Sequence, residues 1–328
     1  MRRREFIARL GTVAAWPVAA RGQQTDRVRR IGVLMSFAED PQTEAFLSLF
    51  IQELAGLGWT DGHNLRMDVR WAGADIDRAH MYAKELVDLQ PDLILTQGTP
   101  MTAAVRRETR TIPLIFMNVS DPVGEGFVAG LPRPGGNITG FISTEAEIAG
   151  KWLELLTNIA PGVKQVAMMF NPDIASVGTY YLPAFEAAAR SLKVKPIAAP
   201  VHSDAEIEAV ITSLGREPGG GLVVTPDSFT LVHRVPIILL AAKNNVPAVY
   251  QNSFFVRAGG LLSYGPDFGD VFRRSASYVD RVLRGAKPSE LPVQQPTKFE
   301  MTLNAKTAKA LGLIVPPSIL LRADEVIE

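Results

Sequence analysis

Cysteine is absent from this 328-residue chain, and aromatic residues make up only 8% of it. Without cysteine there is no disulfide scaffold, no thiolate metal site, no cysteine nucleophile and no lipid-modified anchor. Net charge is also absent, because 34 basic residues balance 34 acidic ones. A nucleic-acid-binding surface normally shows a basic excess, so we expect no nucleic-acid partner. The remaining composition, with 47% hydrophobic residues, is that of a globular chain long enough for about two domains.

Signatures of catalysis and of cofactor binding are missing as well. The chain has no Gly-x-Gly-x-x-Gly or Walker A run, and Pro218–Gly221 lacks the lysine of a phosphate-binding loop. It has no Gly-x-Ser-x-Gly elbow, and its four histidines are scattered without partners at metal-ligand spacing. We therefore expect no cofactor, no metal site and no enzymatic activity.

Residues 1–22 are typical of an export signal. The basic start Met1–Arg4 precedes the weakly apolar Leu10–Val18 and two small residues, Ala19 and Ala20. The run Arg3–Ile7 is similar to the twin-arginine consensus, and an ordinary Sec signal stays open as the alternative. No later stretch approaches the roughly 18 apolar residues of a membrane span. We expect the mature chain to lie free in the periplasm, without a membrane span once the signal is removed.

Short apolar runs alternate with helical patterns along the rest of the chain, as is typical of parallel βαβ units. Several short sequence segments of the first half recur in similar form in the second half, in the same order and at a nearly constant offset. This repetition predicts two similar α/β lobes. The recurring pairs are Ile31–Ser36 with Val166–Asn171, Thr99-Pro100 with Thr225-Pro226, and Ile112–Asn118 with Val246–Asn252.

The candidate ligand site lies at the strand ends, because open α/β sheets bind ligands outside the carboxyl ends of their strands. Thr99 is expected to cap a helix that has Pro100 at its first position, and the free amides of that turn suit a carboxylate. A capping role alone is the alternative for Thr99. Asp227 is expected in the first turn of the equivalent helix in the second half, where it either accepts an ammonium or only interacts with the helix dipole. The full set of candidates is Ser36, Phe37, Gly98, Thr99, Ser120, Asp121, Asn171, Thr225, Asp227, Gln251 and Tyr264.

Four motifs carry a family resemblance: Asp121–Val123, Pro134–Gly140, Gly259–Gly265 and Asn304–Gly312. With them the chain resembles the ABC transporter substrate-binding proteins of the tryptophan/tyrosine-type family, a branch of the type I periplasmic binding fold. The resemblance implies an α/β fold of two Rossmann-like lobes with parallel sheets, joined by a three-segment hinge. It places the N-terminal lobe at 27–142 plus 258–287 and the C-terminal lobe at 143–257 plus 288–328.

The resemblance also implies a function. The chain would be the periplasmic solute-binding component of an ABC importer, which captures an amino acid or a similar small polar ligand between its lobes. Thr99 would hold the ligand carboxylate and Asp227 its ammonium. The closed protein, a monomer, would then dock on an ABC permease in the inner membrane. A periplasmic sensor that presents the same kind of ligand to a membrane receptor is the alternative.

Overall fold

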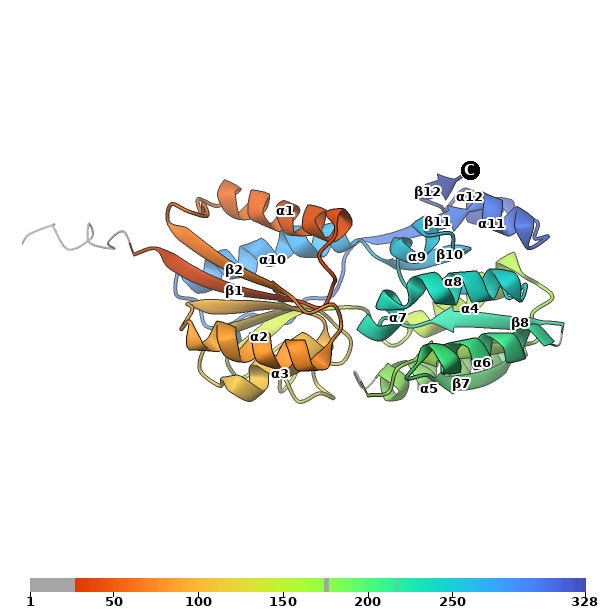
Figure 1. Ribbon diagram of the computed structural model, residues 1–328, viewed down its shortest axis with the longest axis horizontal. Helices are drawn as coiled ribbons and strands as arrows, with labels where there is room; N and C mark the ends of the chain where they lie inside the picture. The colour runs from red at the N-terminus through yellow and green to blue at the C-terminus, as the bar shows by residue number, and fades with distance from the viewer. Residues whose placement is uncertain (1–26, 174–176, 217) are drawn as a thin grey trace, which may run out of the picture.

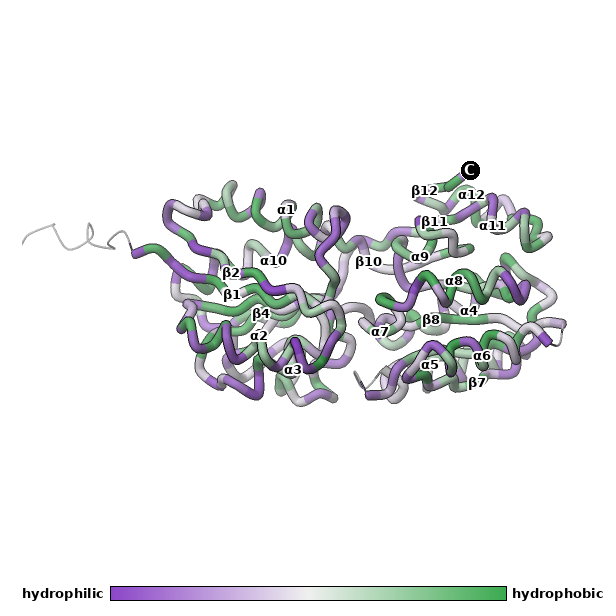
Figure 2. The backbone as a smooth tube through the Cα atoms, viewed as in Figure 1, coloured by the Kyte–Doolittle hydropathy of each residue, from purple (hydrophilic) through white to green (hydrophobic). Residues whose placement is uncertain are grey.

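The computed structural model describes residues 27–173, 177–216 and 218–328, and the expected export signal at 1–22 lies outside them. Two α/β lobes lie side by side along the long axis of the molecule (Figure 1). Central strands such as β4 and β8 are apolar along most of their length, whereas the outer helices alternate between apolar and polar residues (Figure 2). In the described part of the chain, none of the helices combines the length and apolarity needed to cross a bilayer.

The first lobe is a five-stranded parallel sheet in the order β2-β1-β3-β4-β5. Its strands are β1 (Arg29–Met35), β2 (Leu65–Trp71), β3 (Leu93–Gln97), β4 (Leu114–Val119) and β5 (Ile138–Ile142). Helices cover both faces, so the central strands are continuous apolar runs, and every residue of β3 is buried. One face carries α1 (Pro41–Gly56) and α10 (Phe268–Leu283), and the other carries α2 (Ile76–Asp88) and α3 (Thr99–Glu108).

The second lobe is a seven-stranded sheet in the order β12-β11-β10-β9-β8-β6-β7. It is parallel except where β11 runs antiparallel to β10. Its strands are β6 (Gln165–Phe170), β7 (Lys195–Pro200), β8 (Gly220–Val224), β9 (Ala248–Tyr250), β10 (Leu262–Pro266), β11 (Phe299–Asn304) and β12 (Glu325–Ile327). Its helices are α4 (Ile148–Ile159), α5 (Val177–Leu192), α6 (Asp204–Arg216), α7 (Ser228–Val232), α8 (Arg234–Lys243), α9 (Ser253–Arg257), α11 (Ala305–Ala310) and α12 (Pro317–Leu320).

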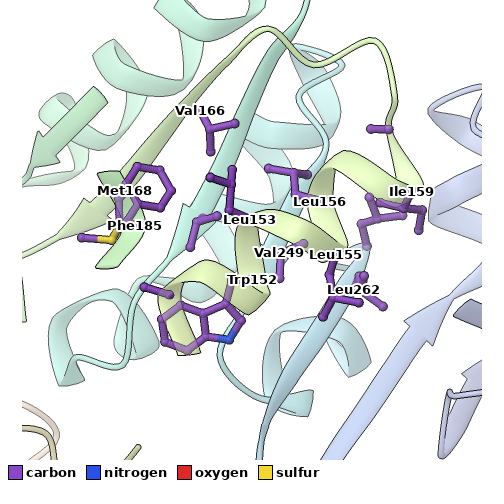
Figure 3. Packing of buried hydrophobic residues seen from close by; sticks show 14 of the residues in the cluster. Trp152, Leu153, Leu155, Leu156, Ile159, Val166, Met168, Phe185, Val249 and Leu262 are labelled. Carbon is purple, nitrogen blue, oxygen red and sulfur yellow. The ribbon is translucent and has the colours of Figure 1, made fainter. Parts of the chain in front are cut away.

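Trp152 on α4 is at the centre of the core on one face of the second sheet (Figure 3). The side chain is fully buried and packs against the ring of Tyr181, with ring centroids 5.5 Å apart. Its indole Nε1 donates a 2.7 Å hydrogen bond to the carbonyl of Tyr264 in β10. Burial of the large apolar ring and satisfaction of its single polar atom together fix α4 against β10.

Three segments connect the lobes, but two of the lobe boundaries expected from the sequence are wrong. Residues 262–266 were expected in the first lobe, yet they form β10, which pairs with β9 and β11 of the second sheet. The chain therefore returns to the first lobe at Asp267, the N-cap of α10. It also stays there beyond 288, because Gln294 exchanges backbone hydrogen bonds with Gly140 (2.8 Å) and Ile142 (2.9 Å). The connections are thus 143–147, the residue pair 266–267, and 295–298.

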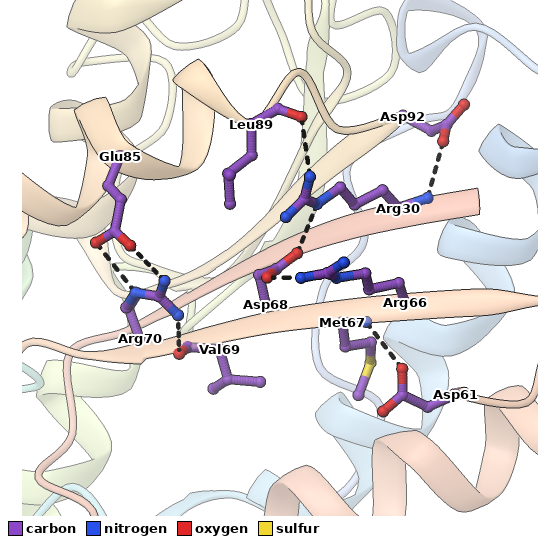
Figure 4. A network of polar contacts seen from close by, with 10 residues as sticks. All are labelled: Arg30, Asp61, Arg66, Met67, Asp68, Val69, Arg70, Glu85, Leu89 and Asp92. Atoms are coloured by element: carbon purple, nitrogen blue, oxygen red, sulfur yellow. Dashed lines mark hydrogen bonds and ion pairs between the residues drawn. The ribbon is translucent and has the colours of Figure 1, made fainter. Parts of the chain in front are cut away.

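A polar network holds the amino-terminal end of the first sheet together (Figure 4). The guanidinium of Arg30 donates to Asp68 of β2 at 2.7 Å, and the backbone amide of Arg30 donates to Asp92 at 2.8 Å. The hydrogen bond from Arg30 lowers the pKa of Asp68 below its usual range. These contacts link β1, β2 and the loop before β3. They lie toward the amino-terminal ends of the strands, on the side of the sheet opposite the carboxyl ends.

We predict that Asp68→Asn lowers the free energy of unfolding by about 1 kcal/mol, because a charge-assisted hydrogen bond at a partly screened site is lost. The loss should appear in thermal melts at pH 7 and vanish in acid. Since the folded pKa is depressed, the contribution is present above the unfolded pKa of about 4 and disappears as pH falls through the lower folded value. Asp88→Asn, at the exposed Lys84–Asp88 pair, is the matched control and should change little. Equal losses in both variants would contradict a special role for Asp68.

Candidate functional site

A cleft lies between the two lobes, at the carboxyl ends of strands from both sheets. It encloses about 450 Å³, counting the part that opens to solvent. This is where the strand topology predicted a ligand site. The first lobe contributes Ser36, Phe37, Gln97, Gly98, Thr99, Pro100, Asn118 and Phe268, the second contributes Pro226, Asp227, Ser228, Leu231 and Gln251, and Ser143 comes from the first connection.

The ends of β1 and β3 form the first-lobe wall. The Oε1 atom of Gln97 accepts hydrogen bonds from both the backbone amide (3.2 Å) and the hydroxyl of Ser36. These contacts do not use the Gln97 side-chain NH₂ group, which stays available as a donor. Gly98 follows with φ of +90°, and a Cβ there would lie 3.1 Å from the Ser36 hydroxyl. Glycine at this position therefore lets the chain turn sharply beside Ser36.

Thr99 begins α3, but it is not the N-cap that the sequence predicted. Gly98 is the N-cap, and its carbonyl accepts from the backbone amide (3.2 Å) and the hydroxyl (2.9 Å) of Thr102. The amides of Thr99 and Met101 precede this first helical bond and have no partner within α3. They belong to the end of the helix where the dipole favours an anion. Thr99 itself is 5% exposed and lines the cleft.

Asp227 faces this wall from the second lobe and is the only ionisable side chain among the described residues that line the cleft. It is the N-cap of α7 rather than a first-turn residue. Its two carboxylate oxygens accept from the backbone amides of Thr230 (2.7 Å) and Asn171 (2.9 Å). Burial raises the pKa of Asp227 to about 6, although these hydrogen bonds favour the charged form. A carboxylate has about four lone-pair sites, so Asp227 keeps acceptor capacity for a ligand.

Asn118, at a bulge of β4, lines the cleft but is not among the candidates chosen from the sequence. Its φ is +55°, and both polar atoms of its side chain are buried without a hydrogen-bond partner. Ser228 on the opposite lobe has a buried hydroxyl that also lacks a partner. The position of Asn118 at the end of a predicted strand was the available signal, because asparagine tolerates positive φ at such turns.

Five candidates from the sequence do not line the cleft, and the structure shows a different environment for each of them. The Thr225 hydroxyl donates to the carbonyl of Met169 (3.0 Å), and Asn171 acts through its backbone amide, which holds Asp227. Asp121 accepts from the amide of Gly124 (2.7 Å) in a turn, and Ser120 is buried. Tyr264 lies in a separate hollow at the connections and stacks on Phe299, with ring centroids 5.6 Å apart. The candidates that do line the cleft are Ser36, Phe37, Gly98, Thr99, Asp227 and Gln251.

A second, more apolar compartment adjoins the cleft and shares Ser36, Phe37 and Leu231 with it. It encloses about 540 Å³, again counting the part that opens to solvent. Phe254 and Val232 supply much of its apolar wall, and Asp40 and Arg234 also line it. Phe37 stands between the two compartments and contacts Phe254 edge to face, with ring centroids 6.0 Å apart. A ligand with a polar head and an apolar side chain therefore finds suitable surroundings for both parts.

The site has none of the features of a metal centre. Within 27–173, 177–216 and 218–328, no three histidine, aspartate or glutamate side chains gather closely enough to hold a metal ion. The chemistry that the described cleft offers is hydrogen bonding from neutral side chains and helix amides, with one carboxylate opposite them.

Two lobes with mostly parallel sheets, three connections and a cleft between strand ends define a two-lobed ligand-binding protein. Residues 30–327 match the family described as ABC transporter substrate binding protein, and the chain belongs to this family. Because this is a family of solute-binding proteins, the assignment confirms that the protein is not an enzyme. It also confirms the resemblance inferred from the sequence motifs and the expected type I fold.

Matches to relatives of known structure or known ligand cover most of the chain. A tyrosine-binding protein of Clostridioides difficile is 25% identical over 293 residues, which cover 89% of this chain and 84% of the relative. The structure of an ABC domain in complex with L-Trp from Streptococcus pneumonia is 26% identical, with a TM-score of 0.83 over 91% of this chain and 99% of the other. A conserved domain protein from Vibrio cholerae is 25% identical, with a TM-score of 0.84 over 92% and 100% of the two chains.

The role of Gly98 can be tested by comparison with Gly285, which also has positive φ (+103°) but has no atom within 4 Å of the Cβ that alanine would add. Alanine at either position should cost about 1 kcal/mol because of backbone strain. We predict that Gly98→Ala loses about 1 kcal/mol more, since its methyl group displaces the Ser36 hydroxyl from Gln97. Thermal unfolding of both variants measures the difference. Equal losses would show that Ser36 moves aside without cost.

Proposed function

We propose that the protein captures an α-amino acid in the cleft, with aromatic amino acids as the first candidates, and delivers it to the permease of an ABC importer. The cleft's charge pattern carries this proposal. One carboxylate, Asp227, faces the amino-terminal end of α3, and the described lining contains no cationic side chain. A zwitterion satisfies both walls: its carboxylate suits the α3 amides beside Thr99, and its ammonium suits Asp227.

The apolar compartment supports an aromatic or large aliphatic side chain on the ligand. Phe37, Leu231 and Phe254 surround the space next to the polar cleft, and aromatic rings in contact prefer such edge-to-face surroundings. The lining of this compartment also holds one anion, Asp40, and one cation, Arg234, so a second carboxylate on the ligand side chain finds no net positive charge there. Because Asp227 adds a further carboxylate in the adjoining cleft, acidic amino acids are disfavoured.

The relatives support the same class of ligand. One is named for tyrosine binding, and another has its structure determined with L-Trp. The TM-score of this protein is 0.83 against that L-Trp complex, whereas it is 0.68 against the ligand-free, open structure of a substrate-binding protein from Clostridium difficile, at 25% identity and 92% coverage of this chain. The lobe arrangement described here is thus more similar to the ligand-bound relative.

Lobe closure on the ligand is the proposed mechanism of capture. Ligand shifts the protein towards the closed form only because it binds that form more tightly, and contacts from both walls supply the preference. Delivery to a permease, a periplasmic location and export through the signal at 1–22 are the further parts of this proposal. The family assignment supports them, as does the basic, weakly apolar start of the chain.

Protein stripped of bound ligand by unfolding and refolding should gain thermal stability with amino acids. At about 100 times its dissociation constant, a ligand adds roughly 2.7 kcal/mol, which corresponds to about 5–10 °C for a protein of this size. We predict the largest shifts with L-tryptophan, L-tyrosine or large aliphatic amino acids, and the smallest with glutamate and aspartate. Larger shifts with dicarboxylates or sugar alcohols than with any amino acid would refute the proposal.

Affinity should also depend on pH through Asp227. An ammonium beside the carboxylate lowers its pKa from about 6 in the free protein, so binding in mild acid releases a proton. We therefore predict a constant Kd above about pH 7 and a rise approaching tenfold per unit as pH falls below about 6. Isothermal titration calorimetry between pH 5 and 8 measures this dependence of Kd on pH. Asp227→Asn should bind more weakly and lose this pH dependence, and a wild-type Kd that is flat across the range would remove Asp227 from contact with the ammonium.

A further inference from the structure

Asn118 has two unusual features at the same place. Of the described non-glycine residues with positive φ, which are Ala74, Gln90, Asn118, Lys193 and Asn245, it alone lines the cleft. Its side-chain Oδ1 and Nδ2 atoms are both buried without partners. Unpaired buried polar atoms are costly, and strained backbone in native structures concentrates at functional sites. The bulge in β4 accounts for the positive φ, but no contact in the described structure satisfies the amide of the side chain.

The second lobe shows what a structural asparagine at the same position does. Asn252 ends the recurring segment Val246–Asn252, as Asn118 ends Ile112–Asn118. Asn252 has extended backbone (φ −154°) and caps α9, because its Oδ1 accepts from the amide of Phe254 at 3.1 Å. Asn118 caps no helix of the described chain, and its Oδ1 accepts no such bond. Its side chain is therefore free for a different partner.

The neighbours of Asn118 indicate which partner that is. The amide of Gly98 donates to the carbonyl of Met117 at 2.8 Å, which places Asn118 directly beside the start of α3. The α3 amides next to it suit a carboxylate, and Asp227 across the cleft suits an ammonium. An asparagine amide offers a donor and an acceptor side by side. This pair matches the head of an α-amino acid, in which a carboxylate group and an ammonium are attached to the same carbon.

We propose that Asn118 is the residue that recognises the amino acid head, with Nδ2 donating to the carboxylate and Oδ1 accepting from the ammonium. This inference rests on the proposed amino acid function and adds to it a requirement for both groups on one carbon. The buried hydroxyl of Ser228 is the matching polar group on the opposite lobe. Closure without ligand leaves all three polar atoms unpaired, so the same groups that recognise the ligand also disfavour empty closure.

The test compares two sets of three probes on the wild-type mature protein and on two variants. The probes are L-tyrosine, its amine tyramine and its deaminated acid 3-(4-hydroxyphenyl)propanoate, together with the corresponding set from L-tryptophan. Asn118→Gly keeps the positive φ without strain but removes the amide, and we expect its Kd for the amino acid to rise about ten- to hundredfold. Asn118→Asp keeps the acceptor and replaces the donor by a second oxygen. It should weaken amino acid binding while tyramine binding is retained, which shifts the ratio of the two Kd values at least about tenfold.

Asn245→Gly is the matched control, because Asn245 has φ of +53° and is exposed away from the cleft. Both glycine variants should have similar ligand-free melting temperatures, while only Asn118→Gly loses affinity. If Asn118→Gly melts well below the control and binds normally, Asn118 is structural and the inference is wrong. Wild-type protein that binds tyramine or the deaminated acid as tightly as the amino acid also overturns it, although the cleft then remains the binding site. Failure of wild-type protein to bind any amino acid overturns the proposed function and this inference together.

Discussion

The hydrogen bonds that tie the connecting segments together are the constraint on which the cleft depends. Gln294, just before the third connection, bonds to Gly140 and Ile142, where the first connection begins, and the amide of Ser143 donates to Val119 at 2.8 Å. Trp152 bonds to the carbonyl of Tyr264, just before the second connection. These contacts hold the three short connections together as a single hinge region. Two sheets held in this way present the carboxyl ends of their parallel strands to each other, and so both walls of the site consist of strand ends.

The same geometry explains why the cleft needs so few charged groups. Strand-end loops and helix starts already supply oriented amides, so the first-lobe wall offers the backbone beside Gly98 and Thr99, and the described lining has no arginine or lysine. Asp227 is buried against two backbone amides, and its raised pKa expresses the unfavourable burial of its charge. An ammonium placed beside it relieves that cost. The proposed zwitterionic ligand would place its ammonium beside this carboxylate without adding a net charge to the cleft.

The alternation of apolar runs and helical patterns predicted both lobes correctly, because burial on two faces forces continuous apolar runs such as residues 114–117 of β4. The boundary expected at 258 was wrong because Gly259-Gly260 is a tight turn inside the second lobe rather than a crossing. A Cβ at Gly260 would lie 2.5 Å from the ring of Tyr250, so glycine is needed there for packing. Thr99-Pro100 located the start of α3 to within one residue. Gly98 is the N-cap in place of Thr99, and the close approach of Ser36, which a Cβ at Gly98 would crowd, is visible only in the structure.

The site residues were harder to predict because matching sequence segments in the two lobes have different structural roles. Thr99 lines the cleft, whereas its counterpart Thr225 is fully buried and bonded to Met169. Asn252 caps a helix, whereas Asn118 holds an unpaired amide beside the ligand site. In each pair, one member bonds to the backbone of its own lobe and the other lines the cleft, although the Nδ2 atom of Asn252 is also buried without a partner. Sequence patterns identify strand ends equally well in both lobes. Only the three-dimensional structure shows which polar groups the fold has already satisfied, and the groups that it leaves unsatisfied at the cleft are the ones available to select a ligand.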